Sequence, residues 1–120
     1  MSKNVFIIDD SRVSRMMIRT ILSKSHPNWS FTEACDGEDA LSKAQGKEID
    51  LMIIDYNMPG QDGLSLASEL KTRHPTACIS MLTANIQEKI RERADALGVG
   101  FVTKPITEAK VNRIASSMES

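Results

Sequence analysis

The sequence contains 120 residues, of which 41% are hydrophobic and 26% are charged, with a formal net charge of −1 at pH 7. These values predict a single folded domain over residues 1–120, and the nearly neutral charge argues against direct binding to nucleic acid or to anionic lipid. No apolar run approaches the about 20 residues that cross a bilayer, so we expect a cytoplasmic protein without membrane insertion. Cys35 and Cys78 lack the spacing of metal ligands, and we expect both to be reduced and buried.

The first half of the chain predicts two strand-helix units. Residues 5–8 are continuously apolar, which is typical of a strand buried on both faces of a parallel sheet. Ser11 is the expected N-cap of the next helix, and an apolar stripe at four-residue spacing predicts that helix's buried face. The stripe consists of Val13, Met17 and Ile21. Residues 29–34 alternate in polarity and predict an edge strand, followed by a helix capped by Asp36.

The second half predicts three more units of the same kind. Residues 51–54, 79–82 and 101–102 are apolar without alternation, which again favours strands covered on both faces. Helical stripes follow each strand, and Thr107 is the expected cap of the last helix. The stripes are Leu66 with Leu70, then Ile86, Ile90 and Ala94, then Val111, Ile114 and Met118. Strands that alternate with helices predict an α/β fold, a doubly wound parallel sheet with helices on both faces.

Functional side chains gather where these predicted strands end. Asp9 and Asp10 follow the first strand, Asp55 the third, Thr83 the fourth and Lys104 the fifth. Because the carboxyl ends of parallel strands form one edge of the sheet, where ligands bind in such folds, we expect these groups to meet there. Each aspartate alone is more simply a turn former or a helix cap, and only their combination indicates a site.

Three carboxylates at one edge require neutralisation. Two of them about 5 Å apart repel by roughly 3 kcal/mol at an effective dielectric constant of about 20, so a bound cation is the simplest solution. Oxygen ligands without histidine or cysteine favour Mg²⁺ over zinc or copper. A carboxylate nucleophile, a cation, a lysine and a hydroxyl are together what phosphoryl transfer needs, with an aspartyl phosphate as its product.

These residues resemble the receiver domain of two-component response regulators. The motifs that carry the resemblance are Asp9-Asp10, Asp55 followed by Met58-Pro59 and Gly63, Thr83-Ala84, and Lys104-Pro105. The resemblance covers the chain from Val5 to about Met118. It implies a flavodoxin-like or CheY-like (βα)5 fold, in which the five parallel strands take the order 2-1-3-4-5.

The resemblance also implies a role for each site residue. Asp55 is expected to be the phosphoacceptor, Asp10 a direct ligand of Mg²⁺, and Asp9 a group that helps to hold the ion through water. Asn57 is expected to offer its backbone carbonyl to the ion, for which Mn²⁺ is expected to substitute. Lys104 is expected to pair with Asp55 or with phosphoryl oxygens, and the peptide bond before Pro105 is a candidate for the cis form.

Two further positions are implied to act as a switch. The Thr83 hydroxyl is expected to move toward the phosphoryl group while the ring of Phe101 turns inward, as a population shift between two states. Phe101 stands where many members carry tyrosine, so no ring hydroxyl is available to a partner. Asn57 and Asn85 occupy the positions that influence hydrolysis of the acyl phosphate, and neither side chain is an acid or a base.

The implied function is a signalling switch rather than an enzyme. A sensor histidine kinase would donate the phosphoryl group, and a downstream protein would bind the face made by the fourth helix, fifth strand and fifth helix. We expect a stand-alone, chemotaxis-like regulator that is a monomer or a weak phosphorylation-dependent dimer. The alternatives are a receiver cut from a larger response regulator or phosphorelay protein, an aspartyl-phosphate phosphatase, and an interaction module that no longer accepts phosphoryl groups.

Overall fold

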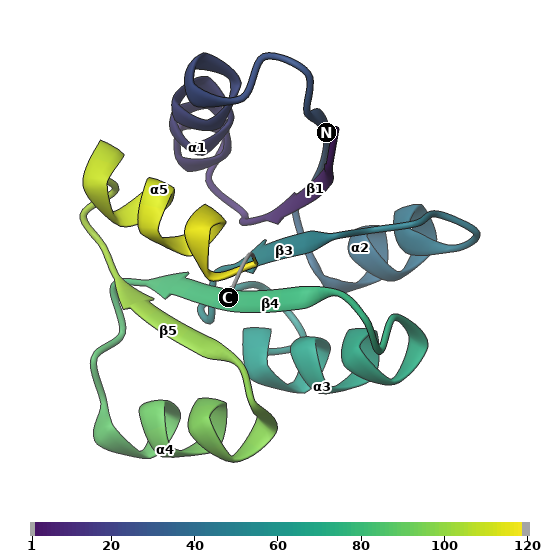
Figure 1. Cartoon of the computed structure of the whole chain (residues 1–120). Coiled ribbons are helices and arrows are strands. Elements are labelled where there is room, and N and C mark those ends of the chain that lie inside the picture. Colours follow the sequence, from purple (N-terminus) through teal and green to yellow (C-terminus); the bar gives the residue numbers. More distant parts are fainter. Residues whose placement is uncertain (1, 119–120) are drawn as a thin grey trace.

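The computed structural model describes residues 2–118, in which strands and helices alternate along the whole chain (Figure 1). The strands are β1 (Asn4–Ile8), β2 (Ser30–Ala34), β3 (Leu51–Ile54), β4 (Cys78–Thr83) and β5 (Gly100–Thr103). The helices are α1 (Arg12–Ser25), α2 (Gly37–Ala44), α3 (Gly63–Arg73), α4 (Glu88–Leu97) and α5 (Glu108–Ser117). All strand pairs are parallel and the sheet order is β2-β1-β3-β4-β5, which confirms the predicted fold class.

The helices begin at residues whose side chains cap them. Ser11, Asp36 and Thr107 adopt extended backbone angles, and each accepts a hydrogen bond from the backbone N–H three residues later. The three caps predicted from the sequence are therefore confirmed. Asp62 caps α3 in the same way by accepting from the backbone N–H of Ser65. Such caps satisfy N–H groups that the first helical turn leaves without partners.

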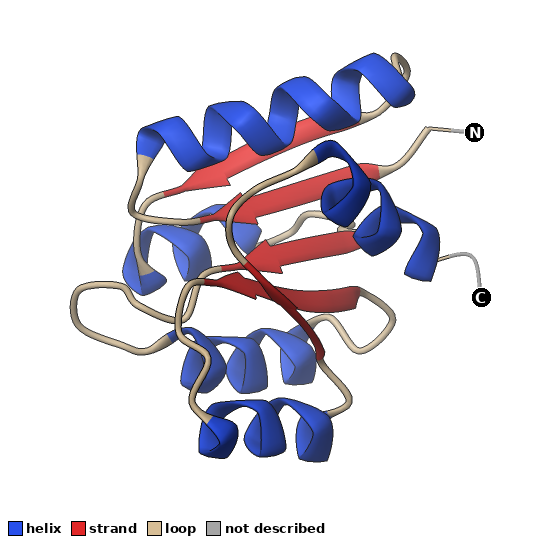
Figure 2. Cartoon of the chain, turned by 90° about the vertical axis from the view of Figure 1, so that its left-hand side faces the viewer, coloured by secondary structure: helices blue, strands red, loops and turns tan. Residues whose placement is uncertain are grey.

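The sheet separates two layers of helices and two parts of the core (Figure 2). Alternate residues of a strand point to opposite faces. In β1, Val5 and Ile7 pack with α1 and α5, whereas Phe6 and Ile8 pack with the residues of α2, α3 and α4. β3 alternates in the same way, with all four of its residues buried. Continuous apolar sequence in these central strands thus reflects coverage on both faces.

The edges of the sheet differ from the centre. β2 is an edge strand with mostly half-buried residues, as its alternating sequence predicts. β5 is the opposite edge, and its residues Phe101, Val102 and Thr103 are also only half-buried. Phe101 and Val102 pack against opposite parts of the core, so both faces of β5 are covered as expected, but the two residues are only half-buried because an edge strand has a neighbouring strand on one side only.

Two predicted helical stripes were wrong in part. On α1 the buried residues are Ile18 and Leu22, while Val13 and Met17 remain 60% and 41% exposed. The helix is therefore rotated by about one residue from the predicted face. Ile86 is 74% exposed and precedes α4, which begins at Glu88.

The predicted burial of the thiols also needs correction. Cys35 is exposed in the loop after β2, and Cys78 is half-buried at the start of β4. Cys35 lies beyond the end of an edge strand, and Cys78 is the first residue of an inner strand, where it packs against the core from one side only. Neither thiol forms a disulfide within residues 2–118. Over the same range, no helix combines the length and apolar character that a bilayer span requires.

Candidate functional site

Strand register places the first and third strand ends side by side. Ile8 of β1 pairs with Ile54 of β3, so the residues that follow, Asp9 and Asp55, leave the sheet together. The backbone N–H of Asp55 donates to the carbonyl of Ile8 at 2.9 Å, which extends the ladder by one residue. Both carboxylates are buried, Asp9 with 2% and Asp55 with 7% of its surface exposed. The sheet itself thus forces two acidic groups into one small volume.

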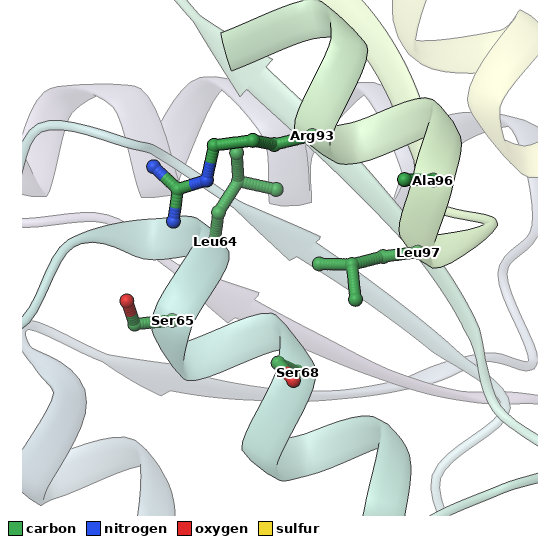
Figure 3. Close-up of a pocket in the computed structure, with 6 residues that line it drawn as sticks. All are labelled: Leu64, Ser65, Ser68, Arg93, Ala96 and Leu97. Carbon is green, nitrogen blue, oxygen red and sulfur yellow. The ribbon is translucent and has the colours of Figure 1, made fainter. Parts of the chain in front are cut away.

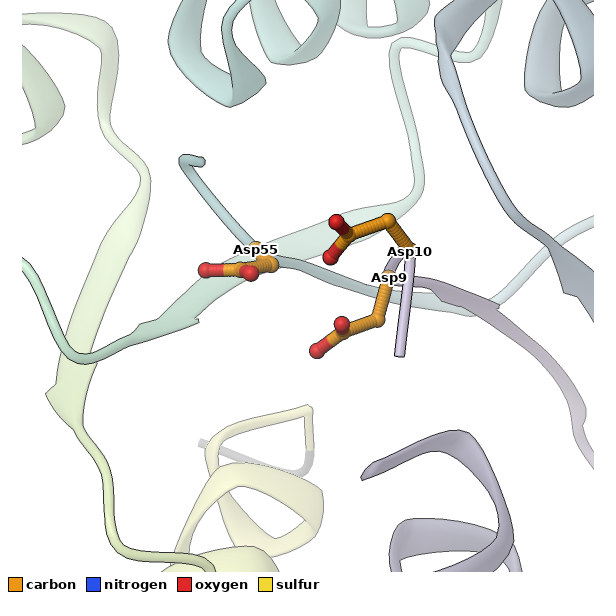
Figure 4. A group of neighbouring side chains, drawn as sticks. All are labelled: Asp9, Asp10 and Asp55. Atoms are coloured by element: carbon orange, nitrogen blue, oxygen red, sulfur yellow. The ribbon is translucent and has the colours of Figure 1, made fainter. Parts of the chain in front are cut away.

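Asp10 completes a group of three carboxylates (Figure 4). One carboxylate oxygen from each of Asp9, Asp10 and Asp55 can be chosen so that all three atoms lie within 4.8 Å of one another. Asp10 is exposed at the rim, whereas the other two lie beneath it. Oδ1 of Asp55 is buried and accepts no hydrogen bond. A buried polar atom without a partner is rare in folded proteins, and oxygen ligands of this charge fit a divalent cation such as Mg²⁺.

Lys104 enters the same group from the end of β5. Its Nζ lies 3.0 Å from Oδ2 of Asp9 and 3.6 Å from Oδ2 of Asp55, so the shorter contact is with Asp9 rather than with Asp55. The backbone N–H of Lys104 donates to the Thr83 carbonyl at 2.9 Å, which holds the lysine against β4. The Lys104-Pro105 peptide bond is cis.

Burial and charge act in opposite directions on Asp9. Removal from water raises the pKa of the Asp9 carboxyl, and the neighbouring Asp55 raises it further. Hydrogen bonds from the backbone N–H of Ser11 and from Lys104 partly offset this rise. The upward shift that remains means that ionising Asp9 costs free energy in the protein without a bound cation.

A second layer of charged residues fixes the backbone at Asp9. Arg15 of α1 donates to the Asp9 carbonyl at 2.6 Å and also to the Glu33 carboxylate of β2 at 3.0 Å. Arg19, one turn further along α1, makes a second ion pair with Glu33 at 3.0 Å. The hydrogen bonds from both arginines lower the pKa of Glu33 despite its partial desolvation, which raises it. Glu33 thereby ties helix α1 to the edge strand beside the site.

Gly63 allows the chain to pass close beneath Asp55. A Cβ atom at Gly63 would lie 2.2 Å from the Asp55 carbonyl oxygen and 2.7 Å from the Tyr56 Cα. The Gly63 N–H donates to the Tyr56 carbonyl at 2.9 Å, which closes the loop between β3 and α3. This approach explains in physical terms why a glycine stands eight residues after Asp55.

Thr83 and Phe101 lie on adjacent strands beyond the carboxylates. Thr83 is fully buried, and its Oγ1 accepts the backbone N–H of Asn85 at 3.2 Å. Phe101 is half-buried, with the Arg91 guanidinium of α4 5.1 Å from its ring centre. Asn57 is exposed in the loop that follows Asp55. The Thr83 hydroxyl is thus buried at the carboxyl end of β4, whereas the Phe101 ring lies near the surface beside α4.

A separate hollow lies between α3 and α4, away from the carboxylates (Figure 3). Its volume is about 480 Å³ and its lining residues are Leu64, Ser65, Ser68, Arg93, Ala96 and Leu97. The Arg93 guanidinium lies 3.8 Å from Asp62, and no carboxylate lines the hollow. It therefore lacks the groups for the chemistry expected at the strand ends.

Two residues near the site escaped sequence reasoning. Ser14 accepts a hydrogen bond from Nζ of Lys104 at 3.3 Å, and Arg15 holds the Asp9 backbone. Their placement depends on how α1 is rotated about its axis. Because Ser11 caps the helix, Ser14 lies one turn into the helix, close to the cap. This spacing was the only feature of the sequence that placed Ser14 near the site.

Comparison with known proteins agrees with this architecture. The sequence pattern of the response regulator receiver domain matches residues 5–116. The chain is 35% identical over 109 residues to Protein CcdB of Bacillus subtilis, covering 89% of each. It is 33% identical over 118 residues to the cyclic di-GMP phosphodiesterase response regulator RpfG of Xanthomonas campestris, covering 96% of this chain and 31% of RpfG. The chain likewise spans only about a third of several methylesterase relatives.

Solved structures show the same fold. The chemotaxis response regulator CheY4 of Vibrio cholerae superposes with a TM-score of 0.86 and 26% identity, covering 98% of this chain and 99% of that one. Response regulator TrrA of Thermotoga maritima, solved in complex with Mg²⁺ and beryllofluoride, gives a TM-score of 0.84 and 26% identity, covering 97% and 98%. The chain belongs to the response regulator receiver domain family of two-component signalling.

Proposed function

We propose that the chain is a phosphorylation-activated switch whose phosphoacceptor is Asp55. One observation carries the proposal: Oδ1 of Asp55 is buried without a hydrogen bond, within a group of three carboxylates and one lysine. Such an arrangement is costly in a protein that only needs to fold, because like charges repel and buried polar atoms lose their water. It suits a protein that completes the site with a cation and a phosphoryl group.

In the proposed reaction a carboxylate oxygen of Asp55 attacks the phosphorus of a phosphohistidine. The phosphohistidine ring carries a proton on its other nitrogen before transfer. As the new P–O bond forms and the P–N bond breaks, the nitrogen that carried the phosphorus takes the electron pair, and the histidine leaves as neutral imidazole. Lys104 lies close enough to Asp55 to pair with the oxygens of the transferred group. The buried position of Asp55 limits access of water to the acyl phosphate that results.

Asp9, Asp10 and Asp55, together with the backbone carbonyl of Asn57, are the groups that would hold Mg²⁺ or Mn²⁺. Such an ion, when bound, supplies positive charge to the phosphoryl oxygens and relieves the repulsion among the carboxylates. Within the protein, Ser11 and Arg15 keep Asp9 in place by binding its carboxylate and its carbonyl. Asp9 is thus oriented before any ligand arrives.

Signal output would begin at Thr83. Its hydroxyl accepts from the Asn85 N–H, and in the phosphorylated state it would donate to the phosphoryl group instead. The half-buried ring of Phe101 would then move into the space that Thr83 vacates and leave the Arg91 guanidinium. This change would alter the face formed by α4, β5 and α5, where a downstream protein would bind.

The biological setting is proposed from the similar proteins. Similarity to chemotaxis protein CheY4 over nearly the full length of both chains favours a stand-alone, chemotaxis-like regulator that is charged by a sensor histidine kinase. The alternative is a receiver that works inside a larger regulator or phosphorelay protein, as the partial coverage of RpfG and of Sensor protein EvgS suggests. In either setting the chain acts as a switch and not as an enzyme on an external substrate.

Beryllofluoride, which mimics a phosphoryl group, provides a direct test. With Mg²⁺ present, it should bind to the wild type and shift the NMR signals of Asp55, Thr83 and Phe101. Asp55→Ala should remove binding, whereas Asp50→Ala, at the opposite end of β3, should leave it intact. Unchanged binding in Asp55→Ala would contradict the proposed phosphoacceptor. In Thr83→Ala, beryllofluoride should still bind, but the shift at Phe101 should be lost.

A further inference from the structure

Lys104 lies near three oxygen atoms from three separate segments: the loops after β1 and β3, and helix α1. Its Nζ lies 3.0 Å from Oδ2 of Asp9, 3.3 Å from Oγ of Ser14 and 3.6 Å from Oδ2 of Asp55. An ammonium group has three N–H donors. Lys104 donates to Asp9 and to Ser14, and its third N–H is left for Asp55, which lies at ion-pair distance rather than hydrogen-bond distance. Two of the oxygens belong to the acidic cluster. The third is a neutral hydroxyl on α1.

The cap of α1 fixes the position of this hydroxyl. Ser11 accepts the backbone N–H of Ser14 at 3.2 Å, and the backbone N–H of Ser11 in turn donates to Oδ1 of Asp9 at 2.9 Å. Ser14 is therefore linked through the helix cap to the same carboxylate that Lys104 contacts. It is half-buried, and the Lys104 side chain is 19% exposed, so water competes only in part for this hydrogen bond.

Attraction between charges has no preferred direction, so the two carboxylates do not by themselves fix where the ammonium group lies between them. A lysine side chain is flexible, and Asp9 offers the shorter of the two carboxylate contacts. An acceptor on the α1 side occupies one N–H of the ammonium and so limits its rotation and displacement. One N–H then remains for Asp55 while another stays on Asp9.

We propose that Ser14 is a positioning residue that holds Lys104 between Asp9 and Asp55. This role rests on the proposed function, because it gives the lysine its place beside the phosphoacceptor. Ser14 does not touch the reacting atoms, and it acts only through Lys104. The alternative is that Ser14 is an ordinary polar residue of the first helical turn whose hydroxyl has no effect on the site.

The test compares rates of phosphorylation by acetyl phosphate with Mg²⁺ in four proteins. Ser14→Ala should slow the reaction by about three- to tenfold, the range expected for loss of one ordinary intramolecular hydrogen bond. Ser14→Thr keeps the hydroxyl and should restore most of the rate. Ser23→Ala, the same substitution at the far end of α1, should match the wild type. Equal rates in Ser14→Ala and wild type would overturn the proposal.

A double-mutant cycle separates positioning from a general effect on α1. In the Lys104→Ala background, Ser14→Ala should cause no further loss, because its only route to the site is gone. The affinity for beryllofluoride with Mg²⁺, measured by NMR titration, gives the same cycle if the lysine variant reacts too slowly for a rate. Equal losses in both backgrounds would overturn the proposal.

A third measurement does not depend on phosphorylation. In metal-free protein labelled with ¹⁵N-lysine, the ammonium signal of Lys104 is identified by its absence from Lys104→Arg. Ser14→Ala should broaden or shift this signal, and Ser14→Thr and Ser23→Ala should not. An unchanged signal in Ser14→Ala would also overturn the proposal. If the wild type is not phosphorylated by acetyl phosphate with Mg²⁺, that result would instead contradict the proposed function itself.

Discussion

The close approach of the backbone at Gly63 to Asp55 leaves no room for a side chain at position 63. Gly63→Ala would place a methyl group 2.2 Å from the Asp55 carbonyl oxygen and 2.7 Å from the Tyr56 Cα. Both are backbone atoms and have little room to move. We expect a loss of about 3 kcal/mol in the free energy of unfolding, at the upper end of typical overpacking costs. Urea denaturation measures it.

Gly46→Ala is the matched control for that substitution. Gly46 has a φ of +70° but no atom near the position of a Cβ, so only its backbone conformation would be strained. Gly46→Ala should lower the free energy of unfolding by about 1 kcal/mol. A smaller loss in Gly63→Ala than in Gly46→Ala would contradict the steric account of the loop beneath Asp55.

Asp10 should affect stability and ion binding in opposite directions. Asp10→Asn removes one of three clustered negative charges, so the metal-free protein should become more stable to urea. Mg²⁺ should bind at least about tenfold more weakly, since even outer partners of a metal site contribute that much. Asp95→Asn, on the exposed side of α4, should change neither quantity. Unaltered Mg²⁺ affinity in Asp10→Asn would place the ion elsewhere.

At the scale of the elements, the rotation of α1 is open to a direct test. Leu22 is fully buried against the sheet, whereas Met17 is 41% exposed. Leu22→Ala should lower the free energy of unfolding by about 3 kcal/mol, as is usual for buried leucines. Met17→Ala should change it by no more than about 0.5 kcal/mol. A larger loss in Met17→Ala than in Leu22→Ala would contradict this rotation and favour the buried face first predicted from the sequence, with Val13, Met17 and Ile21.

The link between α1 and β2 should depend on pH. Hydrogen bonds from Arg19 and Arg15 lower the pKa of Glu33 in the folded protein, against its partial desolvation. A carboxyl with a lowered folded pKa stabilises the fold above its unfolded pKa, ordinarily about 4.5, and this contribution disappears as the pH falls through the folded pKa. Wild type should therefore be more stable than Glu33→Gln at pH 7, and the two should converge in acid.

Unfolding by urea at several pH values measures this difference. Glu69→Gln is the control, because Glu69 makes only a surface pair with Arg73 on one helix, and such pairs contribute little. A difference between wild type and Glu33→Gln that stays constant from pH 7 to strong acid would contradict the account of Glu33 as a charged tie.

The elements differ in how far the sequence could define them. β3 was located to the residue, because a strand covered on both faces leaves an uninterrupted apolar run. α1 has more apolar residues than one face needs, including Val13, Met16 and Met17, so its periodicity alone allowed two buried faces. Exposure of β5 and of Cys35 depends on which strands lie at the edges. The family resemblance implied that order, but the local pattern of residues does not contain it.

For the whole molecule, the site could be anticipated because topology concentrates it. All strands are parallel, so their carboxyl ends, with Asp9, Asp55, Thr83 and Lys104, meet at one edge. The part that could not be anticipated comes from a helix packed against that edge. Ser14 reaches Lys104 across 90 residues of sequence, and no local pattern reveals such a contact.

The two parts of the core are built from alternate residues of the same central strands, so we expect the domain to unfold cooperatively. A ligand that binds only the folded state at the strand ends should then stabilise the entire domain. The same coupling would let a change at Asp55 reach the outer face of β5. The proposed phosphorylation of Asp55 and the proposed change at the partner-binding face would therefore both depend on the packing of the same sheet.

The intact mass of the protein after incubation with acetyl phosphate shows whether Asp55 accepts a phosphoryl group in a reaction that needs a cation. Wild type and Asp55→Ala are compared, each with Mg²⁺ and with a chelator. We expect the addition of one phosphoryl group to the wild type with Mg²⁺, and no addition in the other three samples. Equal addition to Asp55→Ala, or none to any sample, would contradict the claim that Asp55 is the phosphoacceptor of a cation-dependent switch.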